Sequence, residues 1–457
     1  MSEMRENKRA LVIGMALSGI GAAKLLSKHG YEVIINDVKP SIPELEAKLE
    51  GVNYINRLGV DPMELINDVD LIVLSPVIPN FKPFAIQAAE NGVDVTGEIE
   101  IGYRYSNKEA KFAGISGTNG KTTSTTLLGE MAKATGNKTF VLGNIGIPLT
   151  EYADEIKKGD YVVIEVAALQ LESIKTFRMN VAGMINISED HINRFGSMEA
   201  YIASKERIFK FQTEEDYAVL NYDDEVVRKM SELTKGTVVY FSQKENIAYG
   251  ACVREDGMMV WHENGNEIEF VNTNELIIPG KHNVENALCC CAMAVCMGIG
   301  FEAIRDTLRK FKGVEHRIEF VRELNGIQYY NDSKGTNPDS TIRAIEAMSR
   351  PTILLLGVGE YDKQSDFTPL FRAFGDTVKG VVASGINVPA IMAAANRTGF
   401  RNIVEEKGSF EEMIKRAANM AKEGYNVLLS PAAASWGQFA NYEERGRIFK
   451  DIVNKLV

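Results

Sequence analysis

The segment from Gly117 to Thr123 has the composition of a phosphate-binding loop. It reads Gly117-Thr118-Asn119-Gly120-Lys121-Thr122-Thr123 and lies between an apolar run at 111–115 and a helical pattern. In this context backbone N–H groups and the start of a helix hold phosphate oxygens. We expect Lys121 to reach the β- and γ-phosphates of ATP and the Thr122 hydroxyl to bind Mg²⁺. Ile115 stands where the common motif has its first glycine, but the Gly-Lys-Thr ending still predicts an ATP site.

Two further polar groups follow apolar runs that are predicted strands. Glu165 follows the run 161–164, and His191 closes a Ser-Glu-Asp-His segment after the run 181–187. Because neighbouring parallel strands end at one edge of a sheet, we expect Glu165 beside the phosphate loop. A carboxylate there suits Mg²⁺, which prefers oxygen ligands. His191 alone is more typical of a structural turn, and its place among the other motifs favours a role at the site.

Amides and a guanidinium near the end of the central segment complete the expected nucleotide site. Asn283 and Asn286 lie in a Lys-His-Asn-Val-Glu-Asn stretch, and Arg317 ends Gly-Val-Glu-His-Arg. The amides suit the edge of a purine, and an arginine neutralises a phosphoryl group in transfer. The four cysteines between 289 and 296 lack a CxxC spacing and indicate a buried helix instead of a metal site.

The N-terminal turn from Gly14 to Gly21 has the outline of a dinucleotide fingerprint, with Ala16 at a glycine position and Asp37 where a ribose ligand would stand. It predicts either a nucleotide at a helix N-terminus or a tightly packed turn. A dehydrogenase is the weaker alternative, because the loop at Lys121 indicates ATP.

The elements that must position these residues alternate between strands and helices. Strands are predicted at 9–13, 32–36, 71–74, 111–115, 161–164, 328–330, 352–356, 378–383 and 426–429, with helices at 19–29 and 283–297. This order predicts an α/β protein with parallel sheets. We expect three domains: a Rossmann-like one at 1–108, a P-loop-type ATP-binding sheet at 109–313 and a Rossmann-like one at 314–457.

Composition limits the partners. The 457 residues carry a formal net charge of −11, which argues against nucleic acid as a partner. No apolar run reaches the roughly 20 residues of a membrane span, and the charged first nine residues are unlike a signal peptide. We therefore expect a cytoplasmic protein without a membrane span, and a monomer.

These motifs together resemble the Mur ligase family over essentially the whole chain. The stretches 143–146, 331–334, 361–363 and 430–435 are most similar to those of the members that add D-glutamate to UDP-N-acetylmuramoyl-L-alanine. The resemblance implies that ATP phosphorylates a carboxylate and that the amine of D-glutamate attacks the acyl phosphate. It also implies two magnesium ions, held by Thr122, Glu165, His191 and Lys205, the last being the lysine that this family carbamylates.

The resemblance carries the remaining roles onto named positions. Lys121, His191, Lys205 and Arg317 match the catalytic residues. The ATP site matches residues 117–123 with Asn283, Asn286, Arg317 and Asp332. The UDP-sugar site matches Ser18, Asp37, Lys39, Ser75 and Asn144. The D-glutamate pocket matches Thr336, Lys363, Ser435 and Tyr442.

This sequence departs from the family pattern at Ala167-Ala168, where two serines are usual, and at Gly335 and Gly437. The departures keep two alternatives open. One is a related ligase with another acceptor amino acid, although the Asp-Asn-Pro-Arg motif of the diaminopimelate- or lysine-adding enzymes is absent. The other is a non-catalytic, nucleotide-binding regulatory protein derived from a ligase, which would have no need of Lys205.

Overall fold

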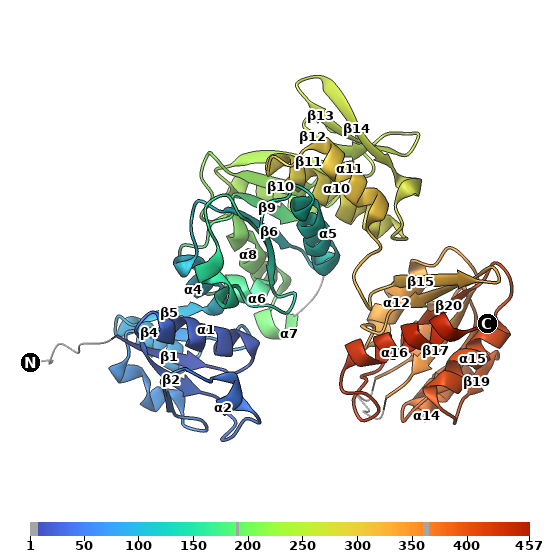
Figure 1. Ribbon diagram of the computed structural model, residues 1–457, viewed down its shortest axis with the longest axis horizontal. Coiled ribbons are helices and arrows are strands. Elements are labelled where there is room, and N and C mark those ends of the chain that lie inside the picture. The colour runs from blue at the N-terminus through green and yellow to red at the C-terminus, as the bar shows by residue number, and fades with distance from the viewer. Residues whose placement is uncertain (1–7, 189–191, 360–364) are drawn as a thin grey trace, which may run out of the picture. The chain divides into compact units, whose positions relative to one another are not determined.

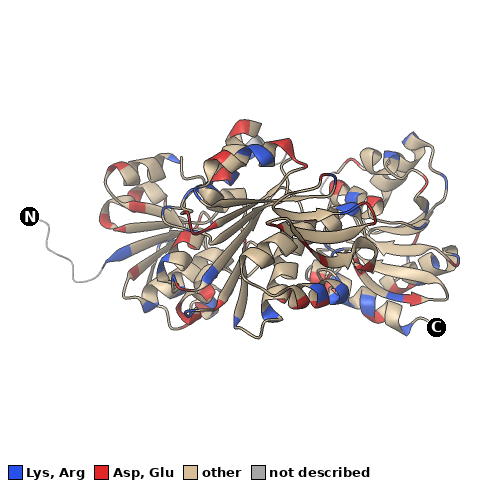
Figure 2. Ribbon diagram, turned by 90° about the horizontal axis from the view of Figure 1, so that it is seen from above, with Lys and Arg blue, Asp and Glu red and all other residues tan. Residues whose placement is uncertain are grey.

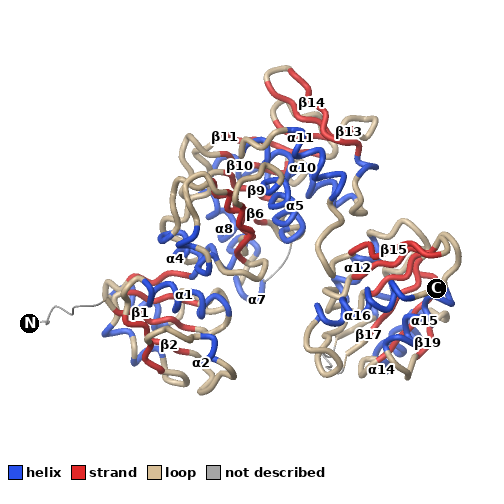
Figure 3. Tube along the Cα trace, in the orientation of Figure 1, coloured by secondary structure: helices blue, strands red, loops and turns tan. Residues whose placement is uncertain are grey.

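A computed structural model describes residues 8–188, 192–359 and 365–457 (Figure 1). Contacts divide the chain into two compact units, one comprising Met1–Thr273 with Glu285–Leu308 and the other Asn274–Val284 with Arg309–Val457. Strands form the centre of each unit and helices cover them, as Figure 3 shows. The predicted α/β class is confirmed.

The first sheet is parallel, in the order β3-β2-β1-β4-β5. Its strands are β1 (Arg9–Ile13), β2 (Glu32–Asn36), β3 (Tyr54–Asn56), β4 (Leu71–Leu74) and β5 (Asp94–Gly97), and its helices are α1 (Leu17–Lys28), α2 (Leu45–Lys48), α3 (Pro83–Glu90) and α4 (Glu98–Tyr105). The chain leaves the central β1 for β2 on one side and returns to β4 on the other. Such a reversal opens a crevice at the carboxyl ends of the strands, where α/β proteins bind ligands.

The second sheet belongs to the same unit and has the order β14-β13-β12-β11-β10-β9-β6-β8-β7. Its strands are β6 (Lys111–Ser116), β7 (Thr139–Gly143), β8 (Tyr161–Glu165), β9 (Val181–Met184), β10 (Tyr217–Asn221), β11 (Thr237–Ser242), β12 (Gly250–Val253), β13 (Met258–Glu263) and β14 (Asn266–Asn272). Its helices are α5 (Lys121–Lys133), α6 (Ala168–Leu171), α7 (Ile192–Phe195), α8 (Met198–Glu206), α9 (Glu225–Lys229), α10 (Lys281–Cys296) and α11 (Phe301–Lys310). Strands β7 to β12 are parallel, whereas β13 and β14 extend the sheet as an antiparallel pair.

Short 3₁₀ helices lie in the connections: η1 (Pro62–Glu64), η2 (Ile66–Asp68), η3 (Leu149–Glu151), η4 (Ala153–Glu155), η5 (Arg207–Phe209), η6 (Met230–Leu233) and η7 (Thr273–Glu275).

Helix α4 fastens the first sheet to loops of the second through two buried carboxylates. Glu98, 2% exposed, accepts hydrogen bonds from the backbone N–H and the hydroxyl of Thr150, both at 2.8 Å. Glu100, 0% exposed, accepts through Oε2 the three successive N–H groups of residues 175–177, at 2.9, 3.0 and 3.0 Å. Burial raises the pKa of Glu98 to about 6. The two sheets are thereby joined by side chains as well as by the chain itself.

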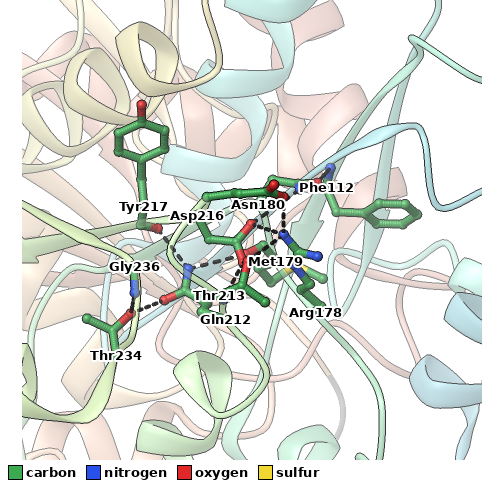
Figure 4. Close-up of polar contacts among 11 residues, drawn as sticks. Phe112, Arg178, Met179, Asn180, Gln212, Thr213, Asp216, Tyr217, Thr234 and Gly236 are labelled. Carbon is green, nitrogen blue, oxygen red and sulfur yellow. Dashed lines mark hydrogen bonds and ion pairs between the residues drawn. The ribbon is translucent and has the colours of Figure 1, made fainter.

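A polar network closes the amino ends of the central strands, at the edge opposite the phosphate loop (Figure 4). Arg178 donates two hydrogen bonds to the fully buried Asp216, at 2.7 and 3.0 Å. The N–H of Thr213 donates to the same carboxylate at 2.7 Å, and Gln212 donates to the carbonyls of Met179 and Tyr217. A buried carboxylate is tolerated only when it is paired in this way.

The second unit contains a sheet of order β15-β16-β20-β17-β18-β19, parallel except for the pair β15–β16. Its strands are β15 (Glu319–Leu324), β16 (Ile327–Asn331), β17 (Thr352–Gly357), β18 (Val378–Ser384), β19 (Ile403–Glu405) and β20 (Asn426–Leu429). Its helices are α12 (Pro338–Glu346), α13 (Thr368–Arg372), α14 (Val388–Thr398), α15 (Phe410–Met420) and α16 (Tyr442–Lys455).

Lys and Arg are interspersed with Asp and Glu along the helices and loops of both units (Figure 2). Within the ranges that the structure describes, none of the helices has both the length and the apolar character that crossing a bilayer requires.

Candidate active site

The phosphate loop connects the end of β6 to the start of α5, as predicted. Gly120 has φ +83°, and a Cβ atom there would lie 2.1 Å from Asn286 Oδ1, so the position requires glycine. Lys121 Nζ folds back over the loop and donates to the carbonyls of Gly117 at 2.9 Å and Thr118 at 2.7 Å. Thr122 and Thr123 lie buried in the first turn of α5, where backbone N–H groups lack an intrahelical acceptor. This turn is suited to an anion.

Two backbone amides of the loop donate hydrogen bonds to Asn186 and not toward the first turn of α5. The N–H of Thr118 donates to the carbonyl of Asn186 at 2.8 Å, and the N–H of Asn119 donates to its Oδ1 at 2.9 Å. Asn186 lies just beyond β9, the strand next to β6. The sequence pattern assigned all residues from 117 to 123 to the nucleotide. The structure divides them into amides that shape the loop and a helix turn that faces the anion.

Glu165 ends β8 at the same level of the sheet as the loop, since it is paired in register with Ile115. It is 2% exposed, and its Oε1 accepts a hydrogen bond from Asn144 Nδ2 at 2.8 Å. Its Oε2 is buried and makes no hydrogen bond to any part of the protein that the structure describes. A desolvated carboxylate oxygen without a donor fits a divalent cation.

Lys205 reaches the loop from α8. It is 1% exposed, and its Nζ donates to the carbonyl of Gly117 at 2.7 Å. Lys121 donates to this same carbonyl oxygen, so two ammonium groups share one acceptor. Ser204 fixes α8 by donating to the carbonyl of Ala168 at 2.8 Å. The structure thus places Lys205 against the phosphate loop, whereas His191 lies outside the described residues.

The expected magnesium ligands suit a hard cation in kind. In the described ranges no three His, Cys, Asp or Glu side chains gather as a ready-made metal site. A carboxylate, a threonine hydroxyl and phosphate oxygens of a nucleotide are the ligand set typical of Mg²⁺, which rarely occupies an all-protein cage. The residues present therefore fit a magnesium ion that binds together with a nucleotide.

The predicted UDP-sugar residues of the first sheet gather at the carboxyl ends of β1, β2 and β4. Asp37 accepts backbone N–H groups through both oxygens, from Met15 at 2.8 Å and from Lys39 at 3.1 Å. Ser75 is buried, and a Cβ on Gly14, which has φ +92°, would lie 2.6 Å from Ser75 Cβ. Asp37 therefore holds the turn that forms this site. Ser18 lies in the first turn of α1, the Lys39 side chain is exposed, and Asn144 contacts Glu165 in the second sheet.

Sequence reasoning missed the apolar flanks of this crevice. Leu17, the first residue of α1, is 64% exposed, and Val38, the second residue after β2, is 90% exposed. Exposed aliphatic side chains near polar strand ends are suited to contact a planar base. In the sequence, Leu17 stands next to Ser18, and Val38 stands between Asp37 and Lys39. These apolar neighbours of predicted ligands could have indicated a base-binding surface, but single exposed apolar residues are common on any surface.

In the second unit, Asp332 lies at the carboxyl end of β16. It is 4% exposed and accepts a hydrogen bond from Ser430 Oγ at 2.6 Å. Burial raises the pKa of Asp332 to about 7. A Cβ on Gly335 would lie 2.5 Å from Asp332 Oδ2, which explains why this chain has glycine at 335. Thr336 follows this turn directly and is half-buried.

The remaining predicted residues of this unit lie in turns or at the starts of helices. Asn283 donates to the carbonyl of Pro279 at 2.6 Å. Arg317 lies in the turn that precedes β15 and is half-buried. Ser435 is buried, and Tyr442 begins α16 with its phenol pKa raised to about 12 by burial and by Glu443. Lys363 lies outside the described residues.

Sequence reasoning also missed Arg445, which is 0% exposed. It donates to the carbonyls of Ser333 at 2.8 Å, Val358 at 2.7 Å and Ala433 at 3.2 Å. These carbonyls follow three neighbouring strands, so a single side chain holds the loops of this edge together. In the sequence Arg445 follows two glutamates and looks like part of a solvated helix face.

Three family models match successive parts of the chain: "Mur ligase MurD-like, N-terminal domain" at residues 8–97, "Mur ligase middle domain" at 115–294 and "Mur ligase, glutamate ligase domain" at 316–433. UDP-N-acetylmuramoylalanine--D-glutamate ligase of Thermoanaerobacter pseudethanolicus is 43% identical over 455 residues, covering 99% of each chain. The enzyme of that name from Clostridioides difficile is 40% identical over 453 residues, again covering 99% of each.

Solved structures share the fold at lower identity. UDP-N-acetylmuramate-alanine ligase MurC of Thermotoga maritima matches with a TM-score of 0.58 at 19% identity, covering 98% of this chain and 99% of that one. A pseudomurein peptide ligase type C of Methanothermus fervidus matches with a TM-score of 0.53 at 19% identity, covering 98% and 100%.

Proposed function

This chain belongs to the Mur ligase family, and we propose that it adds D-glutamate to UDP-N-acetylmuramoyl-L-alanine, using ATP, in peptidoglycan biosynthesis. Relatives that carry the name of this activity match nearly the full chain at 40–43% identity, which supports the choice of acceptor. The observation that carries the chemistry is the buried Oε2 of Glu165 at the level of the phosphate loop, which has no hydrogen-bond partner among the described residues.

We assign one substrate to each predicted segment. Residues 1–108 bind the UDP-sugar, with Ser18, Asp37, Lys39 and Ser75 at the crevice. Residues 109–313 bind ATP at the phosphate loop. Residues 314–457 bind D-glutamate. The crevice at the carboxyl ends of β1, β2 and β4 supports the first assignment, because it combines polar groups with the exposed side chains of Leu17 and Val38.

The proposed reaction has two displacements. A carboxylate oxygen of the alanyl substrate attacks the γ-phosphorus of ATP, which forms an acyl phosphate and releases ADP. The amine of D-glutamate then attacks the acyl carbon, and the tetrahedral intermediate collapses with loss of inorganic phosphate and a proton. Lys121 and the first turn of α5 offset the charge on the transferring phosphoryl group. We assign the same role to Arg317.

We expect two magnesium ions, which would polarise the phosphoryl oxygens and offset their charge. Thr122 and Glu165 would hold one of them, and His191 and Lys205 the other. The proposal requires Lys205 to be carbamylated: its neutral amine adds carbon dioxide and loses a proton, which converts a cation into a carboxylate-like ligand. The crowding of two ammonium groups on the Gly117 carbonyl supports this change, because an anion at Lys205 would pair with Lys121.

In the acceptor site, Lys363, Ser435, Thr336 and Tyr442 would bind the carboxylates of D-glutamate. We assign Asp332, Asn283 and Asn286 to nucleotide binding. We place the enzyme in the cytoplasm, because ATP and UDP-activated sugars are cytoplasmic metabolites. We further propose that it acts as a monomer.

The test is release of inorganic phosphate in a complete and a depleted mixture. We expect turnover only when ATP, Mg²⁺, UDP-N-acetylmuramoyl-L-alanine and D-glutamate are all present. Replacement of D-glutamate by L-glutamate, L-lysine or meso-diaminopimelate should abolish it. Equal turnover with any of these amino acids would overturn the assigned acceptor, and absence of turnover in the complete mixture would favour a regulatory protein.

A further inference from the structure

A hydrogen-bond relay connects α10 to the phosphate loop through Asn186. This asparagine accepts the N–H of Thr118 through its backbone carbonyl and the N–H of Asn119 through its side-chain oxygen. Its side-chain nitrogen donates to Glu285 Oε1 at 2.9 Å. One residue thus receives two successive amides of the loop and is itself held from α10.

The carboxamide of Asn186 can serve both neighbours in only one orientation. If its oxygen and nitrogen exchanged places, its NH₂ group would face the N–H of Asn119, and its oxygen would face the Glu285 carboxylate. Both contacts would be repulsive. Glu285 therefore selects the rotamer in which Asn186 receives the loop amide. Burial raises the pKa of Glu285, and Asp223 and Asp224 add to this shift, whereas hydrogen bonds from Asn186 and Asn221 oppose it.

Helix α10 contacts the loop and α5 at adjacent positions, which makes it a rigid support. Asn286, the next residue, limits position 120 to glycine, since a Cβ there would lie 2.1 Å from its Oδ1. One turn further along, the Cys290 thiol donates to the carbonyl of Ser124 at 3.2 Å. Helix α10 thus contacts the loop at Asn286 and α5 at Cys290.

We infer that Glu285 is a positioning residue for ATP: acting through Asn186, it holds the amides of Thr118 and Asn119 so that the loop is preformed around the phosphates. This inference rests on the proposed ATP site. Without Glu285 the Asn186 side chain can rotate, and the loop must be ordered when the nucleotide binds. Binding then loses the advantage of a preorganised site.

The first test compares Glu285→Ala with Glu285→Gln. Glu285→Ala removes the hydrogen bond between Asn186 and residue 285. We expect it to raise the KM for ATP about five- to tenfold, the factor that corresponds to one hydrogen bond. The KM for the UDP-sugar should stay unchanged, because that substrate is assigned to the first sheet. Glu285→Gln retains an acceptor oxygen and should stay within about twofold of the wild type. Glu302→Ala removes an exposed carboxylate from the first turn of α11 and is the matched control.

The second test is a rescue. Asn186→Asp places two carboxylates face to face and should raise the KM for ATP more than Glu285→Ala does. The double variant Asn186→Asp, Glu285→Gln restores a donor to face an acceptor, and it keeps the charge of the pair as in the wild type. It should recover most of the affinity for ATP. A merely structural contact would lower the thermal stability of the single variants without such a specific recovery.

Direct binding of Mg·ATP, measured by calorimetry on the full chain, separates the possible failures. If the wild type binds no ATP, the proposed function is wrong. If the wild type binds ATP but Glu285→Ala binds it equally well, or the double variant is no better than Asn186→Asp, the relay has no role in positioning and the inference is wrong.

Discussion

Replacement of Gly120 by alanine tests the central geometry of the site. The residue has φ +83°, a conformation that costs a non-glycine residue about 1 to 3 kcal/mol. The added Cβ would also lie 2.1 Å from Asn286 Oδ1, far inside contact distance, so that side chain must move or the loop must open. Either movement disturbs the turn around Lys121.

Gly136 provides a matched control. Its φ is +81°, and a Cβ there would meet nothing within 4 Å. Gly136→Ala therefore incurs the same backbone cost without a clash. We expect both variants to lose about 1 to 3 kcal/mol of stability from the backbone conformation, measured as a shift in thermal unfolding. Only Gly120→Ala should raise the KM for ATP, by about tenfold or more, which corresponds to about 1.4 kcal/mol.

The reasoning would be refuted if Gly120→Ala bound ATP like the wild type, or if Gly136→Ala impaired ATP binding to the same extent. The double variant Gly120→Ala, Asn286→Ala removes the atom in conflict. It should be more stable than Gly120→Ala alone if the clash is the cause.

Four further outcomes are expected. Lys205→Ala should lose most turnover and regain part of it with added short-chain carboxylates; full activity in this variant would exclude a metal-bridging role. Glu165→Gln should raise the Mg²⁺ concentration needed for half-maximal turnover at least tenfold while leaving UDP-sugar binding unchanged. Arg178→Ala should destabilise the first unit by about 3 kcal/mol, because it leaves the buried Asp216 without its cation, with no change in the KM for ATP. Burial raises the pKa of Asp332 from 3.8 to about 7, so the stability that its protonated form contributes is full below pH 4 and is lost as the pH rises through 7. Asp332→Asn should therefore unfold at a higher temperature than the wild type at pH 8 but not at pH 4. Equal dependence of the unfolding temperature on pH in the two proteins would contradict this.

The strands of the buried sheets could be predicted because their signal is local. The ranges predicted for β1, β2, β4 and β20 match the observed strands at both ends. Each contains a continuous apolar run of three or four residues, as expected for strands covered on both faces. The phosphate loop could also be predicted, because glycine at 120 indicates a backbone conformation with positive φ and lysine at 121 supplies the positive charge that a phosphate needs.

The contacts that support the site could not be predicted, because they depend on partners distant in sequence. Asn186 and Glu285 lie 99 positions apart, and neither residue type is unusual in its own segment. The sequence around Arg445 suggests a solvent-exposed charge, because its three carbonyl partners come from distant parts of the chain. Glu98 and Glu100 belong to a helix whose buried face includes two carboxylates, which a periodicity of apolar residues does not reveal.

The grip of α4 on the loops at Thr150 and 175–177 has a consequence for how the protein can be divided. A fragment ending near residue 108 would expose Glu98, Glu100 and Ile99, which packs in the core of the second sheet. The severed remainder would lose the acceptors for four backbone N–H donors. The first hundred residues thus match a family model of their own but depend on loops of the second sheet for their packing. If these residues were exchanged between relatives, α4 and the loops at Thr150 and 175–177 would have to come from the same protein.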